Sequence, residues 1–217
     1  TSLFRSLDYF NPQETADYIG AVTRNYQASR QSAEFVLSED DIPRLHELSE
    51  GRPILLSLYL QLAFQNREIR SKSLGTRAEE FEEFLVNELM GSEIGDALRA
   101  AGRAPKGVDL ALFAGIRGFR DKNGSISNEN LEYVGKEFEQ LKKMSFAKTF
   151  RDSDRLFLHD QMYDMLNRHI YAHQDDISEA TEAREAASQI FDYYKQVIEQ
   201  KNQRSEERRV GKECRSR

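Results

Sequence analysis

The sequence predicts a mainly α-helical fold with one short β-hairpin. Apolar residues recur at helical spacing along most of the chain, and several stretches carry the residues that begin or end helices. Strand-like apolar runs around a polar turn are expected between residues 145 and 158. With 217 residues, 39% hydrophobic and 31% charged, the chain can bury a core and has the length of one or two domains.

The first 90 residues have the pattern of a small helical bundle. Asn11-Pro12-Gln13-Glu14 predicts a helix start, because asparagine caps, proline fits the first turn and the glutamate can bond back to the cap. Gly51 is expected to end a helix and Pro53 to begin the next. Residues 54–64 are almost wholly apolar but too short to cross a bilayer, which predicts a central helix. Thr76-Arg77-Ala78-Glu79 is a capping-box pattern.

The middle of the chain predicts helices followed by a hairpin. A weaker helical segment at 92–106 precedes apolar helices at 108–119 and 128–144. Strands are expected at 145–150 and 156–158. Three helices followed by a two-stranded ribbon is the order of a winged-helix domain.

The stretch Arg155–Leu166 changes its apolar period in the middle. The residues before His159 resemble a buried strand, whereas those from Asp160 to about Ile170 show the spacing of one helix face. Asp160 is well placed to cap the free backbone N–H groups of that helix. His159 either faces an anion such as phosphate at this joint or packs at the strand end, and spacing alone leaves both interpretations open.

The C-terminal part divides into two. A helix from Glu179 to about Lys201 carries small and aromatic residues on one face, as the first hairpin of a helical repeat would. Residues 204–217 hold six basic residues and three acids, so they contribute +3 to the net charge of −6 and the rest carries −9. This tail resembles translated vector sequence and is set apart from the fold; a native basic tail is the alternative.

Composition argues against several classes of protein. A single cysteine, Cys214, excludes an internal disulfide and a cysteine-rich zinc site, which fits a reducing cytoplasm. We find no apolar run long enough for a membrane span and no signal peptide. The first residue is Thr, which suggests a start inside a larger protein. The net negative charge, and four acids against three lysines in helix 128–144, argue against DNA binding.

Motifs of common enzymes do not occur. The sequence has no GxxxxGK[ST] loop, no HExxH, no CxxC and no GxSxG, which argues against catalysis by this chain alone. His169 and His173 are four residues apart and could share a metal ion, but no third ligand is indicated, so surface histidines are the favoured interpretation.

Two short motifs in order resemble a known family. Gly51-Arg52-Pro53 resembles the GxP motif of the STAND signal-transduction ATPases, the NACHT and NB-ARC relatives of AAA+ proteins. Leu158-His159-Asp160 resembles their MHD-like motif at the end of the winged helix, and the stretch from Phe10 to Tyr18 resembles their first lid helix. The resemblance covers about residues 1–200. The Walker A and Walker B segments would lie before Thr1 and are not in this sequence.

The resemblance implies an architecture. It places a helical, AAA+ lid-like (ARC1-like) subdomain at 1–104, a winged-helix domain with a short β-hairpin at 105–172 and the start of TPR-like helical repeats at 173–203, before the tail at 204–217.

The resemblance also implies residue roles. In this family the proline of GxP packs near adenine and the histidine of the MHD motif contacts the β-phosphate of ADP. By position, Pro53 and His159 take these roles, with Gly51 and Arg52 forming the corner and Asp160 supporting the loop.

The expected function follows from the resemblance. The chain would contribute an ADP/ATP clamp to a cytoplasmic signalling switch whose P-loop domain, with the magnesium site, is supplied by the missing N-terminal part. The parent would be an ATPase that binds protein partners through helical repeats and oligomerises when activated. The alternative is a winged-helix DNA-binding or protein-interaction adaptor without nucleotide.

Overall fold

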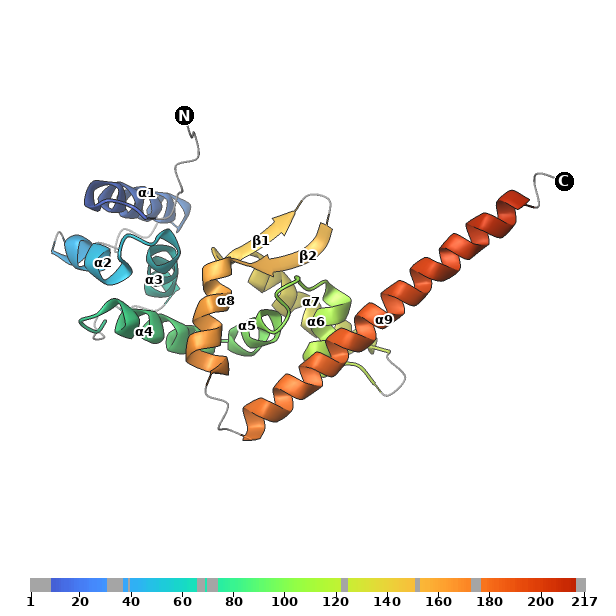
Figure 1. Cartoon of the computed structure of the whole chain (residues 1–217). Coiled ribbons are helices and arrows are strands. Elements are labelled where there is room, and N and C mark those ends of the chain that lie inside the picture. Colours follow the sequence, from blue (N-terminus) through green and yellow to red (C-terminus); the bar gives the residue numbers. More distant parts are fainter. Residues whose placement is uncertain are drawn as a thin grey trace, which may run out of the picture.

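The computed structural model describes residues 9–30, 37–38, 40–65, 69, 74–121, 125–150, 153–172 and 177–213. For residues 29–30, 177–179 and 203–213 it describes the backbone only. This part of the chain is mainly helical with one small antiparallel sheet (Figure 1), as the sequence predicts. The expected helix end near Lys201 is wrong, because the last helix continues to Glu213.

The first group of elements is a helical bundle. It consists of α1 (Pro12–Arg30), α2 (Asp41–Ser49), α3 (Pro53–Gln65) and α4 (Ala78–Met90). The apolar helix α3 lies at its centre, and residues such as Leu55, Leu56 and Leu58 are fully buried. The predicted central helix is therefore confirmed, since a helix that is apolar on all sides is stable only when neighbours cover all of them.

Helix caps agree with the sequence in one place and differ in another. Asn11 and Glu14 bond reciprocally, with the Asn11 N–H donating to the Glu14 carboxylate and the Glu14 N–H to the Asn11 side chain. The expected Thr76–Glu79 box is wrong by one residue: Glu80 accepts from the Thr76 N–H, because α4 begins only at Ala78. The hydrogen bonds that Glu80 accepts from the Thr76 N–H and from the Arg77 side chain lower its pKa to about 2.

The second group combines helices with the sheet. It consists of α5 (Gly95–Gly102), α6 (Leu110–Ile116), α7 (Asn128–Lys142), β1 (Ala147–Phe150), β2 (Ser153–Leu158), α8 (Asp160–Leu166), the π-helix η2 (Asn167–Tyr171) and α9 (Ile177–Glu213). The strands β1 and β2 pair antiparallel, with Ala147 opposite Leu158. Figure 1 shows α9 crossing this group and extending well beyond it.

Val108 adds a third short segment to the sheet. Its N–H donates to the carbonyl of Leu156 at 2.9 Å, and the Leu156 N–H donates back at 2.7 Å. The helix expected at 108–119 is therefore shorter, because Val108 pairs with β2 before Asp109 caps α6. The Val108 segment lies between α5 and α6 in the chain. Helix α5 belongs to this second group, because it contacts α6, α7, β2 and α8. The boundary at 104/105 stays a prediction.

The helix after β2 also differs from the expectation. The predicted α-helix to Ile170 is wrong in its second half, because α8 ends at Leu166 and η2 follows. A π-helical hydrogen bond spanning five residues joins the Ala172 N–H to the Asn167 carbonyl at 2.9 Å. Such turns are rare and often mark functional sites.

Candidate functional site

The Gly51-Arg52-Pro53 corner is a tight helix–helix turn. Helix α2 ends with Glu50 and Gly51 in the left-handed region, at φ 52° and 71°, and Pro53 is the first residue of α3, as predicted. Gly51 is buried against the segment before α1, since the Phe10 N–H donates to the Gly51 carbonyl at 2.7 Å. A Cβ on Gly51 would lie 2.1 Å from the Phe10 carbonyl oxygen, so glycine is required by space as well as by φ.

Arg52 is held inside the protein. Its Nη1 lies 2.8 Å from the Glu82 carboxylate on α4, and its Nε donates to the Ser49 carbonyl at 3.2 Å. The side chain is only 14% exposed. Arg52 therefore connects the corner to α4 and is engaged within the chain itself.

His159 stands at the joint between β2 and α8. Its backbone N–H donates to the Phe146 carbonyl at 2.7 Å, and its Nδ1 accepts from the Gln161 N–H at 3.4 Å. His159 is thus the N-cap of α8, and the expectation that Asp160 caps is wrong. Asp160 is the first residue of the helix instead and points its exposed carboxylate toward Lys148, at 4.0 Å from Nζ.

Burial lowers the pKa of His159 below its ordinary 6.5. The positive charge of Lys148 lowers this pKa further, and the negative charge of Asp160 opposes the shift. The imidazole is therefore mainly neutral at pH 7. With Nδ1 accepting a hydrogen bond, the ring carries its proton on Nε2, which can donate to an oxygen acceptor.

The structure does not bring the two motifs into direct contact. Among the described residues, none of the hydrogen bonds or ion pairs joins His159 or Asp160 to the corner. Arg52 reaches instead, through Glu82, to Arg168 and His169 in η2. These lie at the far end of the helix that His159 begins, roughly 15 Å away by helical rise.

Glu82 is the site residue that the sequence did not reveal. Its side chain is only 1% exposed, and it binds Arg52 through one oxygen and Arg168 and His169 through the other, each at 2.8 or 2.9 Å. Four other glutamates of α4 surround it in the sequence, so nothing in the pattern distinguished it from them. The capping-box pattern singles out only Glu79 among these acids.

Hollows lie elsewhere on the described surface, of which two have well-defined linings. One of about 540 Å³ lies between the end of α5, η2 and α9, and four alanines of α9 form part of its lining. Another of about 760 Å³ includes the stacked rings of Tyr26 and Phe64, whose centroids are 3.9 Å apart. Neither is lined by the corner or by His159 and Asp160. Within the described ranges, no cluster of three His, Cys, Asp or Glu residues could hold a metal ion, and His173 lies outside those ranges.

Comparison with family models, curated proteins and solved structures finds no match for this chain. In the part of the chain that the structure describes, no helix has both the length and the apolar character needed to cross a membrane. The functional assignment therefore depends on the residues themselves and on their arrangement.

Proposed function

We propose that this chain is the C-terminal part of the nucleotide switch of a STAND-class signal-transduction ATPase. The observation that carries the proposal is the order of elements around the two motifs. The helical group α1–α4 contains the Gly51-Arg52-Pro53 corner, and it is followed by α5, a single residue (Val108) bridged to β2, the helices α6 and α7, and the β1–β2 hairpin. This second order is that of a winged-helix domain, and His159 and Asp160 come directly after its last strand.

The local geometry supports the proposed role of His159. It is half-buried, fixed by its backbone bond to Phe146 and neutral at pH 7, so its Nε2–H can donate to a phosphate oxygen. Lys148 lies close enough to lower its pKa and would add positive charge beside the phosphate. In this proposal Pro53 lies near the adenine of ADP or ATP, and a preceding P-loop domain holds the remaining phosphates and the magnesium ion.

The other elements have proposed roles too. The projecting helix α9 would begin the helical repeats that bind protein partners. The parent protein would hydrolyse ATP and oligomerise when activated, whereas the chain described here would bind nucleotide only feebly alone.

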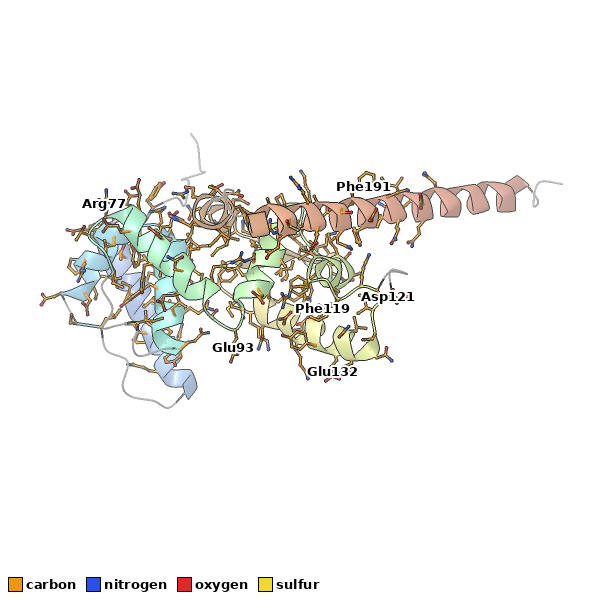
Figure 2. The ribbon with its side chains drawn as sticks, turned by 90° about the horizontal axis from the view of Figure 1, so that it is seen from below. Arg77, Glu93, Phe119, Asp121, Glu132 and Phe191 are labelled. Atoms are coloured by element: carbon orange, nitrogen blue, oxygen red, sulfur yellow. The ribbon has the colours of Figure 1, made fainter. Side chains whose placement is uncertain are left out.

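A protein-interaction adaptor is the second candidate, favoured by the surface of α7. Lys136 and Lys142 are paired with Glu132 and Glu139, so they do not present free positive charge to DNA. Figure 2 shows Glu132 on the side of α7 turned away from α9. Leu131 and Tyr133 are 41% and 52% exposed on the same helix, which suits a protein surface better than a phosphate backbone.

The decisive experiment measures ADP release from the parent protein. His159→Ala should speed ADP dissociation by about tenfold or more, the scale of one lost charge-assisted hydrogen bond, and should raise basal activity. Asp164→Ala, on the exposed side of the same helix, is the matched control and should leave the rate unchanged. An unchanged rate in His159→Ala would refute the proposal, as would micromolar ATP binding by the present chain alone in calorimetry. Salt-dependent retention on DNA would favour a DNA-binding module instead.

A further inference from the structure

The Glu82 cluster joins three segments that are distant in sequence. Arg52 comes from the corner before α3, Glu82 from the middle of α4, and Arg168 and His169 from η2. The chain passes from the first group of helices to the second at Gly91–Ile94, so this cluster is a non-covalent connection across that division. A second, uncharged connection lies elsewhere, where Gln61 on α3 accepts from Ser145 at 3.2 Å.

Burial makes the Glu82 carboxylate dependent on its partners. A carboxylate removed from water is stable as an anion only when cations and donors surround it. Arg52, at 14% exposure, is also withdrawn from solvent, whereas the Arg168 side chain is 53% exposed and contributes less. The Arg52–Glu82 pair is therefore the stronger part of the cluster. The other carboxylate oxygen of Glu82 binds Arg168 and His169 of η2.

Two adjacent residues of the π-helical turn reach one oxygen. Arg168 Nη2 and His169 Nε2 both lie 2.9 Å from Glu82 Oε1. Neighbouring side chains of a helix diverge strongly, so the long, flexible Arg168 side chain has to turn toward the oxygen that His169 also contacts. π-helical turns are rare and occur often at functional sites, and here the turn coincides with the contacts to Glu82.

We propose that Glu82 is a latch residue that fixes the Gly51-Arg52-Pro53 corner to the helix beginning at His159, and that it keeps η2 in its π-helical form. The latch needs no nucleotide, so it goes beyond the proposed function. If that function is correct, the latch also sets the spacing between the two sides of the clamp. Breaking it frees both the corner and η2 without unfolding the rest of the chain.

Hydrogen–deuterium exchange on the present chain tests the latch. Glu82→Gln keeps the shape but removes the charge, and it should speed amide exchange by about tenfold or more both at 49–56 and at 164–172. Glu83→Gln, the exposed neighbour on α4, is the matched control and should change neither segment. The amides of Leu112 and Phe113 in α6 should keep their rates in both variants, because they report opening of the buried core.

The outcomes separate a latch from a general stabilising contact. Faster exchange at both segments with unchanged α6 supports the proposal. Equal acceleration throughout the chain, or a change confined to α4, overturns it. If Glu82→Gln does not fold, the double variant Arg168→Gln, His169→Gln decides, because it removes both η2 partners of Glu82 and leaves α4 unchanged: faster exchange at 164–172 with unchanged α6 supports the latch, and unchanged exchange at 164–172 overturns it. Failure of ADP binding in the parent would leave these results unaffected.

Discussion

At the residue scale, steric space restricts which residue is tolerated at one position, and burial and charge shift the pKa at another. The two effects can be measured separately. Gly51 is constrained twice, by its positive φ and by the Phe10 carbonyl, which occupies the space that a Cβ would need. His159 is constrained by its backbone bond to Phe146 and by burial. Each constraint predicts a different response to substitution or to pH.

Gly51→Ala should destabilise the protein more than an alanine at another left-handed glycine. Gly118 has φ +75°, and no atom lies within 4 Å of the point that a Cβ would occupy, so Gly118→Ala should cost only the backbone strain, about 1 kcal/mol. Gly51→Ala adds a clash with backbone and should cost at least about twice as much. Urea denaturation measures both, and equal losses would show that the corner can relax.

The titration of His159 should be displaced to low pH. Its folded pKa is below 6.5 while the unfolded pKa is ordinary, so the unfolded chain binds the proton more readily. The stability due to this group is thus present above pH 6.5 and is lost as pH falls through the folded pKa. NMR titration of the imidazole should give a pKa below that of a peptide histidine, and Lys148→Gln should raise it toward 6.5. A pKa at or above 6.5 in the intact chain would contradict this.

At the element scale, helix boundaries follow local chemistry where the capping residues are unambiguous. The Asn11–Glu14 pair forms as predicted because both partners lie within one turn of each other. The Thr76 box is displaced because Glu79 and Glu80 are chemically equivalent candidates, and the structure uses Glu80. Local patterns therefore find helix starts, but they do not choose between adjacent residues of the same type.

Asn11→Ala should destabilise α1 by about 1 kcal/mol, because the first-turn N–H groups lose their acceptor. Asn25→Ala, exposed within the same helix, is the control and should be neutral or slightly stabilising, since alanine is the better helix former. Thermal unfolding followed by circular dichroism compares the two. Similar melting temperatures for both variants would mean that the reciprocal cap contributes little.

At the scale of the whole molecule, a continuous buried core runs through both groups of helices. It includes Phe81 of α4, at 0% exposure, and Phe113 of α6. Helix α9 packs one face against this core through Tyr193, extends beyond the body, and carries Phe191, at 68% exposure, on the side turned away from the core in Figure 2. The latch at Glu82 therefore acts on segments at the edge of one common core.

Phe81→Ala should lower the free energy of unfolding by about 3–5 kcal/mol, because it removes a fully buried ring and leaves a cavity. Phe150→Ala, at a side chain that is 58% exposed on β1, should cost less than about 1 kcal/mol. Both can be measured by guanidinium denaturation. A loss for Phe81→Ala no larger than that for Phe150→Ala would argue against a shared core.

Local sequence patterns were enough to predict the mainly helical class, the central helix α3, the hairpin and the Gly51–Pro53 corner, because periodicity, caps and turn residues act over a few positions. The burial of Glu82, the pairing of Val108 with Leu156 and the capping of α8 by His159 became clear from the packed fold. Periodicity shows which face of a helix is apolar. It does not show which of several glutamates at the edge of that face will meet an arginine from a distant segment, because that partner is brought near by packing.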